Sequence, residues 1–574
     1  MTDVATGTGS DDQIEDPTPR LLEIEAALAA PGGMFEIHEE IVLGEPMPVF
    51  AQRMGSLREL LVNSLGFGDN DYLVFTDGVT ERRYSFREHG RAVASVAVVL
   101  RDRYGVQPGD RVAILGANSP EWIITFWATI ALGAVAVGLN GWWSGPEIRY
   151  GIELADPRVL VVDRKRLARL DGEDPGVPTI VMEDDFEALT RVAPDAPLPD
   201  QPIDEDDPAI ILFTSGTTGR PKGAVHTHRN ALALLGIQFF HGVRMMTLMP
   251  PEAGGPPGCN LVSSPLFHVS GLHTAVITFL ATGQKSVWTV GKFDPVTVMG
   301  LIEREKITNW SFTATTLHRI VTHPDRGNYD LTSLRSGGGG GSPFSLKLQN
   351  QGKEVFPNLR SKMGVGYGLT ECTALATLNA GPELALFPDS CGRPLPTVAV
   401  EIRDPDGNVL PDGQEGEVCI HGPNIMLEYW RNPEATAETI QPGRWLRSGD
   451  IGWMDRGRLY LASRKRDMIL RGGENVYPVE IEQRLEDHEL VIEAAVVGVD
   501  HEDLGQEVKA VIVVEPGTTV DTDDLTRFCA EALAYFKVPA HWDVRTEPLP
   551  RNASGKVVKG LLVEGSADVA FIEE

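Results

Sequence analysis

The chain contains 574 residues, of which 42% are hydrophobic and 23% are charged, a balance that is ordinary for a folded globular protein. A chain of this length is too long to fold around a single hydrophobic core, so we expect two or more domains. The formal net charge of -30 at pH 7 argues against broad contact with nucleic acid or anionic lipid. The five cysteines form no C-x-x-C pair and no metal-ligand spacing, which favours free thiols in the reducing cytoplasm.

The N-terminal part of the sequence shows no targeting segment. Residues 1–19 are polar and acidic and lack the positive and apolar regions of a signal peptide, so we expect a disordered tail. The uncharged stretch 122–143 is long enough to cross a bilayer. However, the tripeptide at 119–121 is typical of a helix start and Gly133 of a helix end, with a short strand expected at 134–139. We therefore predict a buried helix and strand, and no transmembrane segment.

Strand and helix patterns alternate through the first 400 residues or so. Short β-branched runs separated by helical patterns predict α/β layers with largely parallel strands. From about Pro396 the strands and turns follow one another closely, so we expect a β-rich subdomain over 396–463 inside a large domain, 20–463. The β-branched runs lie at 111–118, 159–162, 210–213 and 286–290.

A second domain is expected after the basic run at 464–466. The remaining residues, 464–574, alternate helix and strand again, and their number suits a separate α+β domain. We expect helices at 479–485 and 525–534, and strands at 494–499 and 508–514.

The strongest chemical signal is the segment 209–228, AIILFTSGTTGRPKGAVHTH, in which an apolar strand leads into a turn of hydroxyls, glycines and one lysine. Hydroxyls donate to phosphate oxygens, glycines let backbone N–H groups approach an anion, and the lysine adds positive charge. The turn is not a Walker A loop, because Gly223 rather than Ser or Thr follows Lys222. The predicted phosphate ligands are Thr214, Ser215, Gly216, Thr217, Thr218, Gly219 and Lys222.

Further motifs follow this turn in order along the chain. They are SPLFHVSGL at 264–272, GYGLTE at 366–371, GEVCIHG at 416–422, WLRSGDIG at 445–452, SRKRDMILRGGENVYP at 463–478 and PRNASGKVVK at 550–559. Together these motifs resemble those of the adenylate-forming (AMP-binding) superfamily, which includes acyl-CoA synthetases, luciferases and the adenylation domains of peptide synthetases. The resemblance implies an α/β fold with α+β parts: a large N-terminal domain of layered α/β subdomains and a small mobile C-terminal domain.

The resemblance also implies that ATP activates a carboxylic acid as an acyl-adenylate. Since the carboxylate and the α-phosphate are both anions, cations and hydrogen-bond donors must surround that phosphate. Glu371 in the GYGLTE motif would hold Mg²⁺, because a hard cation prefers carboxylate oxygen, and Thr370 would donate to the α-phosphate.

The nucleoside of ATP would be held by three segments. The glycine-rich patch 336–343 is by itself typical of a flexible loop, but the resemblance places it at the adenine edge. It also places Asp450 against both ribose hydroxyls, with Arg464 donating from the other side. The residues expected to contact adenine are Gly340, Gly341, Ser342, Gly366, Tyr367 and Gly368, of which Tyr367 offers a flat ring face.

Lys556 matches the catalytic lysine that bridges the substrate carboxylate and the α-phosphate during adenylation. For the second half-reaction, family members rotate the small domain so that the thiol of coenzyme A (CoA) reaches the acyl carbonyl. Arg466 occupies the hinge position, where the family commonly carries Asp or Lys, so the arginine is a mild departure. Gly472 and Gly473 would border the CoA channel.

His268 matches a position that lines the junction of the acyl pocket and the thiol channel, although a core histidine is the alternative. The small or apolar residues that follow it, 269–272, favour a fatty or other hydrophobic acid over a charged one. We interpret one of His226 and His228 as a phosphate neighbour and neither as a metal ligand.

The sequence therefore predicts an ATP-dependent acyl-CoA ligase that uses Mg²⁺, ATP, CoA and a carboxylic acid. A ligase that loads a free-standing carrier protein shares every motif, and a luciferase-like monooxygenase is a rarer alternative. A non-catalytic nucleotide-binding regulator would be expected to lack Lys556 or Glu371, and both are present. The sequence leaves the identity of the acid, the pathway and the oligomeric state open, a homodimer included.

Overall fold

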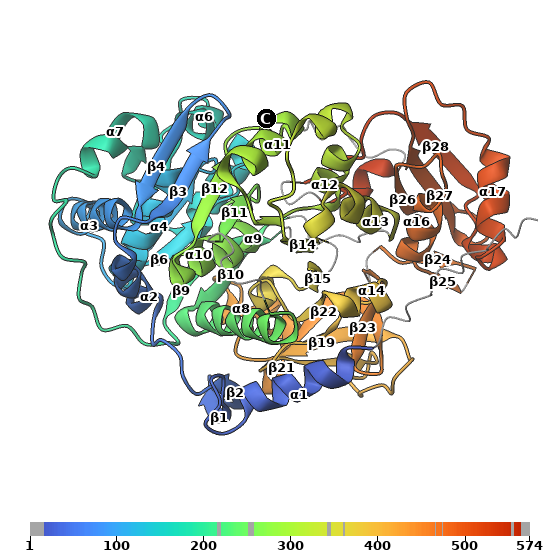
Figure 1. Ribbon diagram of the computed structural model, residues 1–574, viewed down its shortest axis with the longest axis horizontal. Coiled ribbons are helices and arrows are strands. Elements are labelled where there is room, and N and C mark those ends of the chain that lie inside the picture. Colours follow the sequence, from blue (N-terminus) through green and yellow to red (C-terminus); the bar gives the residue numbers. More distant parts are fainter. Residues whose placement is uncertain are drawn as a thin grey trace, which may run out of the picture.

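The computed structural model describes residues 16–214, 220–250, 258–340, 346–359, 362–464, 467–472, 474–552 and 556–563. Two large mixed sheets with covering helices form most of the molecule, and a third, β-rich part packs below them (Figure 1). A small unit at the C-terminal end of the chain lies at one end of the long axis (Figure 1). The structure thus has the predicted α/β and α+β class.

The first large sheet has the strand order β20-β10-β9-β6-β5-β7-β8. Strands β5 to β9 run parallel to their neighbours, whereas β9 turns back into the antiparallel β10. Their apolar runs are buried on both faces, as expected when helices cover both sides of a sheet. The strands are β5 (Arg111–Leu115), β6 (Val135–Gly138), β7 (Val159–Val162), β8 (Thr179–Val181), β9 (Pro208–Thr214), β10 (Lys222–Thr227) and β20 (Glu428–Tyr429).

The second large sheet has the strand order β17-β16-β15-β14-β13-β11-β12-β3-β4 and is parallel from β3 to β15. All four predicted β-branched runs form strands of these two sheets. The strands are β3 (Asp71–Thr76), β4 (Glu81–Ser85), β11 (Cys259–Val262), β12 (Lys285–Thr289), β13 (Asn309–Ser311), β14 (Ser336–Gly340), β15 (Met363–Tyr367), β16 (Thr377–Ala380) and β17 (Arg393–Pro394).

The glycine-rich patch was wrongly predicted as a loop in its first half, because Ser336–Gly340 forms the interior strand β14. A Cβ atom added to Gly338 would lie 2.2 Å from the carbonyl oxygen of Gly364 on β15, and one added to Gly340 would lie 2.4 Å from that of Gly366. Strands β14 and β15 therefore lie too close for side chains, and glycine is needed for close packing rather than for flexibility.

Helices cover both sheets, and α3 packs on α4 at one edge of the molecule (Figure 1). Ser85 caps α3 through a capping box, so the start of this helix follows from its sequence. The helices of the large domain are α1 (Thr18–Ala29), α2 (Leu57–Ser64), α3 (Phe86–Asp102), α4 (Pro120–Ala131), α5 (Gly145–Ala155), α6 (Arg164–Leu167), α7 (Met182–Leu189), α8 (His228–Leu248), α9 (Val269–Gly271), α10 (Thr278–Thr282), α11 (Pro295–Glu305), α12 (Ala314–Val321), α13 (Leu346–Val355), α14 (Pro382–Leu386) and α15 (Pro433–Thr439).

The apolar stretch 122–143 folds as predicted. Ser119 caps α4 by accepting from the backbone N–H of Trp122, Gly133 adopts a left-handed φ of 66° after the helix, and β6 follows. Both elements are buried inside the first sheet and its helices. Among the described residues, one helix, α8, is long and apolar enough to cross a membrane, and 39% of its most apolar window is buried in the protein.

The β-rich part begins near the predicted position. Strand β22 pairs with β19, β21 and β23, and β18 completes the sheet. After β18 the chain turns at 405–408, where the Gly407 N–H donates to the Asp404 carbonyl. The strands are β18 (Ala399–Arg403), β19 (Gly416–His421), β21 (Ile440–Gln441), β22 (Trp445–Asp455) and β23 (Arg458–Arg464). The intervening strand β20 leaves this sheet and joins β10 of the first sheet.

The small C-terminal unit has the strand order β25-β24-β27-β26, with β28 paired to β27, and two helices. Both predicted helices and both predicted strands exist, although the second helix begins three residues and ends four residues before the prediction. The elements are β24 (Ile469–Arg471), β25 (Glu474–Val476), α16 (Pro478–Glu486), β26 (Glu493–His501), β27 (Gly505–Val513), α17 (Thr522–Ala530) and β28 (His541–Arg545). Lys347 of α13 donates to the carbonyls of His488 and Val491, 3.3 and 3.2 Å away, and so links the large domain to this unit.

The N-terminal segment contains ordered structure earlier than predicted, because α1 begins at Thr18 rather than after residue 19. The hydroxyl of Thr18 accepts a hydrogen bond of 2.6 Å from Arg458 of β23, which fixes the start of the helix. Beside α1, the strands β1 (Ile37–Val42) and β2 (Glu45–Phe50) form a separate antiparallel ribbon (Figure 1).

Helix α1 is anchored by one carboxylate that serves two arginines. Glu25 pairs with Arg244 of α8 and, at 2.9 and 3.1 Å, with Arg393 of β17. The arginine side chains are only 5% and 13% exposed. Removing one partner of a buried ion pair leaves the other charge uncompensated, which costs more than the pair itself contributes.

We expect Glu25→Ala to lower the free energy of unfolding of the large domain by about 3 kcal/mol, measured by urea denaturation followed by tryptophan fluorescence. Glu23→Ala is the matched control, because Glu23 forms an ion pair with Arg20 in which both side chains are mostly exposed. The control should change stability by less than about 0.5 kcal/mol. Equal stability of the two variants would contradict the anchoring role of Glu25.

Candidate active site

The phosphate turn connects two strands that are paired up to its edges. Strand β9 ends at Thr214 and β10 begins at Lys222, and these two residues lie opposite each other in the antiparallel register. The turn is therefore the loop of a hairpin at the edge of the parallel strands. The predicted ligands between them, Ser215, Gly216, Thr217, Thr218 and Gly219, lie outside the described residues.

Lys222 and Glu371, which were predicted from separate motifs, meet at one tyrosine. The Nζ atom of Lys222 lies 5.0 Å from the ring centroid of Tyr429, a cation–π distance. The hydroxyl of Tyr429 donates to Oε1 of Glu371 at 2.7 Å. Tyr429 is buried, and burial together with the Glu371 carboxylate raises its pKa, so the phenol keeps its proton.

Tyr429 was not predicted from the sequence. A tyrosine followed by a tryptophan has no chemical pattern of its own, and its position about sixty residues after Glu371 gives no hint of contact. The role of Tyr429 depends on the pairing of β20 with β10, which places it opposite Ala224.

Thr370 and Glu371 lie in the short helix η6 (Thr370–Cys372), whose backbone is held from two sides. The Nε2 atom of His226 lies 2.8 Å from the Thr370 carbonyl, and the backbone N–H of Met426 donates to the Glu371 carbonyl at 2.9 Å. Burial lowers the pKa of His226 to about 4, so its imidazole is neutral at physiological pH and donates through an Nε2–H.

The second histidine of this region has a different neighbour. The Nδ1 atom of His228 accepts from the backbone N–H of Leu57 at 3.2 Å, and burial lowers its pKa to about 4. Among the described residues, no group of three or more histidines, cysteines, aspartates or glutamates could hold a metal ion.

The predicted adenine and ribose residues lie next to one another. The hydroxyl of Tyr367 at the end of β15 donates to Oδ2 of Asp450 at 2.8 Å. Asp450 on β22 lies opposite Arg464 on β23, so the two predicted ribose ligands are cross-strand neighbours. Gly340 pairs with Gly366 in the β14–β15 register.

Gly368 follows β15, and a Cβ atom there would lie 2.0 Å from the Ala374 carbonyl, so only glycine fits. Gly341 and Ser342 lie outside the described residues, as do Arg466 and Gly473. Gly472 adopts a left-handed φ of 59°, and its N–H donates to the Leu504 carbonyl at 2.8 Å.

His268 and Lys556 approach each other although they belong to different domains. His268 precedes α9, and its Nδ1 lies 3.1 Å from the Ser270 hydroxyl. Burial lowers the pKa of His268 to about 4, and the positive charge of Lys556 lowers it further. The lysine is held in a tight turn, because its N–H donates to Oδ1 of Asn552 at 3.0 Å and its carbonyl accepts from the Asn552 N–H at 2.9 Å.

The residues present fit a magnesium ion that arrives with a nucleotide. Mg²⁺ is usually held by one or two carboxylates together with substrate phosphates rather than by a cage of protein ligands. Glu371 offers one such carboxylate, and its bond from Tyr429 uses Oε1 and leaves Oε2 for a ligand.

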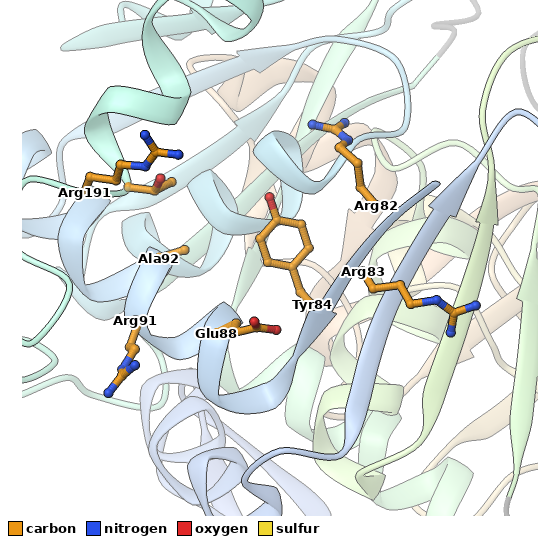
Figure 2. Close-up of a pocket in the computed structure, with 8 residues that line it drawn as sticks. Arg82, Arg83, Tyr84, Glu88, Arg91, Ala92 and Arg191 are labelled. Atoms are coloured by element: carbon orange, nitrogen blue, oxygen red, sulfur yellow. The ribbon is translucent and has the colours of Figure 1, made fainter. Parts of the chain in front are cut away.

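A separate pocket of about 510 Å³ lies between β4, α3 and the end of α7, away from these residues (Figure 2). Its lining includes Arg82, Tyr84, Arg91 and Arg191. Figure 2 shows these side chains around the pocket. Two of the arginines already form ion pairs, Arg82 with Glu121 and Arg191 with Glu187. This pocket contains no residue of the motifs, so it is not the active site.

Comparisons with known proteins identify the family. The sequence model described as AMP-binding enzyme matches residues 65–430, and that described as AMP-binding enzyme C-terminal domain matches residues 480–556. The chain is 34% identical to a feruloyl-CoA synthase from Amycolatopsis sp, over 83% of this chain and 92% of that protein. It is 30% identical to a long-chain-fatty-acid–CoA ligase from Bacillus subtilis, over 80% of this chain and 86% of that one.

A solved structure agrees with the sequence relatives. The o-succinylbenzoate CoA synthetase from Bacillus subtilis, in complex with its acyl-adenylate intermediate, is 29% identical and superposes with a TM-score of 0.73. The match covers 89% of this chain and 98% of that structure. The protein therefore belongs to the AMP-binding, or adenylate-forming, enzyme family and is an ATP-dependent acid–thiol ligase.

Proposed function

We propose that this enzyme uses Mg²⁺ and ATP to activate a hydrophobic, fatty carboxylic acid as its acyl-adenylate and then transfers the acyl group to CoA in the cytoplasm. One observation carries the proposal: Lys222 and Glu371, which belong to different motifs, converge on Tyr429, whose ring centroid lies 5.0 Å from Lys222 Nζ and whose hydroxyl lies 2.7 Å from Glu371 Oε1. Lys556 of the small domain adds a second cation, whose charge acts on His268.

The charges around this place suit the first half-reaction. A carboxylate that attacks the α-phosphorus of ATP meets electrostatic repulsion, which fixed cations and donors offset. Lys222 and Lys556 supply positive charge from opposite domains, and Thr214, Thr370 and the turn 215–219 supply hydroxyl and backbone donors. Mg²⁺ on Glu371 would neutralise phosphate charge when it is bound.

The adenosine would lie along the β14–β15 edge. Gly340, Gly341, Ser342, Gly366 and Gly368 allow close approach of a base, and Tyr367 holds Asp450 through a hydrogen bond of 2.8 Å. A carboxylate oriented in this way accepts well from ribose hydroxyls, and Arg464 on the neighbouring strand completes the ribose contacts.

The surroundings of His268 favour an apolar acid. Val269 and Leu272 after it are buried, and the imidazole itself is neutral. A charged group on the acyl chain would lose its hydration against these buried apolar side chains. Named relatives act on feruloyl, long-chain fatty and indoleacetate substrates. The panel of acids described below measures the preferred chain length and ring content of the acid.

The second half-reaction requires the small domain to move. In the adenylation arrangement that we propose, Lys556 covers the site, so a thiol needs another approach to the carbonyl. We assign the hinge to Arg466 and the wall of the CoA channel to Gly472 and Gly473, whose loop would face the site after rotation.

A panel of aliphatic, aromatic and polycyclic acids tests the proposed function through AMP release with ATP and Mg²⁺, with and without CoA. We expect turnover that depends on CoA and is highest for an aliphatic fatty acid. Turnover with an acyl carrier protein in place of CoA would support the carrier-loading alternative, which a fatty acid–[acyl-carrier-protein] ligase from Streptomyces coeruleorubidus, 34% identical over 79% of this chain, represents. Absence of AMP release with every acid would contradict ligase activity.

We expect Lys556→Ala to reduce adenylation, measured by pyrophosphate exchange, by at least 100-fold, because a charge that stabilises the transition state is lost. Thioester formation from supplied acyl-adenylate should change less than about 3-fold, because the lysine is absent from that step. Lys537→Ala is the control: this small-domain lysine pairs with Glu480 at 2.5 Å and lies outside the motifs. Equal loss of both half-reactions would contradict the assigned role of Lys556.

We expect Arg466→Pro to leave pyrophosphate exchange within about 2-fold of the unmodified enzyme and to reduce thioester release by at least 10-fold. Proline restricts φ and the preceding residue, so a rotation at this position is blocked while the adenylation arrangement persists. Stopped-flow measurement of each half-reaction separates the two effects. Unchanged overall turnover would place the hinge elsewhere.

A further inference from the structure

We propose that Tyr429 is a positioning residue that sets the carboxylate of Glu371 for Mg²⁺ and couples it to the phosphate turn through Lys222. This inference rests on the proposed function, in which Glu371 holds the metal. It concerns a residue outside the motifs from which that function was inferred.

The segment that contains Tyr429 is tied to both motifs by backbone hydrogen bonds. The N–H of Trp430 donates to the Gly223 carbonyl at 2.7 Å and so continues the hairpin that holds the phosphate turn. Four residues earlier, the N–H of Met426 donates to the Glu371 carbonyl at 2.9 Å. The segment therefore connects β10 of the first sheet with the η6 turn beside the second.

Two polar side chains strengthen the connection to η6. The amide of Asn424 donates to the Cys372 carbonyl at 2.9 Å, and the Thr373 hydroxyl donates to the Asn424 carbonyl at 2.7 Å. Asn424 and Thr373 are fully buried, so these bonds are shielded from water. The η6 turn cannot shift relative to this segment without breaking them.

The hydroxyl of Tyr429 selects one oxygen of the carboxylate. A carboxylate only accepts hydrogen bonds, so the phenol must be the donor, and its target is Oε1 of Glu371. The Thr439 hydroxyl also interacts with the phenol oxygen. With Oε1 held, rotation about the last side-chain torsion is prevented and Oε2 presents itself to the metal in one orientation. Partners that orient a metal ligand in this way typically contribute 10- to 100-fold to metal affinity.

The ring of the same tyrosine faces the cation of the phosphate turn. Lys222 Nζ lies 5.0 Å from the ring centroid, on a strand whose next residues pair with β20. A movement of Lys222 on nucleotide binding would therefore change the position of Tyr429, which orients Glu371. Nucleotide and metal sites are then linked by one side chain rather than by solvent.

Packing alone accounts for the ring but not for the hydroxyl. The ring lies in a small apolar cluster with Ala224, Met426 and Ala435, where phenylalanine would fill the same space. The buried hydroxyl of Tyr429 therefore serves the carboxylate, and Tyr429→Phe removes this contact without opening a cavity.

The test measures binding of a non-reactive ATP analogue, α,β-methylene-ATP, by calorimetry in Mg²⁺ and in EDTA. For the unmodified enzyme we expect Mg²⁺ to tighten binding. Tyr429→Phe should lose 10-fold or more of this gain and leave binding in EDTA within about 2-fold. Tyr72→Phe is the matched control, because its buried hydroxyl donates to the Val276 carbonyl at 3.1 Å, outside the motifs, and it should keep the full gain.

Three outcomes overturn the inference. A Tyr429→Phe variant that keeps the full Mg²⁺ gain, or one that loses binding equally in Mg²⁺ and EDTA, has no role in orienting the metal ligand. A Tyr429→Phe variant that is too unstable to measure counts as equal loss, because the hydroxyl then serves folding rather than the metal ligand. In the Glu371→Gln background, Tyr429→Phe should cause no further loss of the Mg²⁺ gain. A further loss would contradict the proposal that Tyr429 acts through the carboxylate. A missing Mg²⁺ gain in the unmodified enzyme, by contrast, refutes the metal role of Glu371 in the proposed function itself.

Discussion

The geometry of the site depends on holding opposite charges at fixed distances inside a protein whose net charge is -30. A strongly acidic chain repels ATP at long range, so binding requires local cations that their own carboxylates do not neutralise. Most arginines on the surface are paired with Asp or Glu. Lys222 instead faces the ring of Tyr429, which attracts the cation without cancelling its charge. Its positive charge stays available to a phosphate.

The site is assembled where separately folded layers meet. Thr214 and Lys222 belong to the first sheet, η6 follows β15 of the second sheet, and Asp450 belongs to the β-rich part. The strand β20 belongs in sequence to the β-rich region but pairs with β10, and this exchange fixes the layers relative to one another. Glycines in β14 and after β15 let the second sheet pack tightly beside the site, since side chains there would collide with backbone.

Buried histidines surround this junction in their neutral form. His226, His268 and His273 are buried, and burial lowers the pKa of each below its usual value. Neutral imidazoles add no charge to this junction. In the proposed adenylation step Lys556 would add its charge from the small domain, which Lys347 links to the large domain.

The sequence by itself determined the fold class, five strands of the two large sheets, two helices and two strands of the C-terminal unit, and the order of the motifs. These features depend on local periodicity, capping and chain order, which are visible without contacts. Three features were decided only by the tertiary structure. The glycine patch is an interior strand because β14 lies against β15, α1 starts early because Arg458 bonds to Thr18, and Tyr429 joins two motifs because β20 crosses to another sheet. Each depends on a partner that is distant in sequence, and composition or spacing along one chain does not specify which distant residues meet.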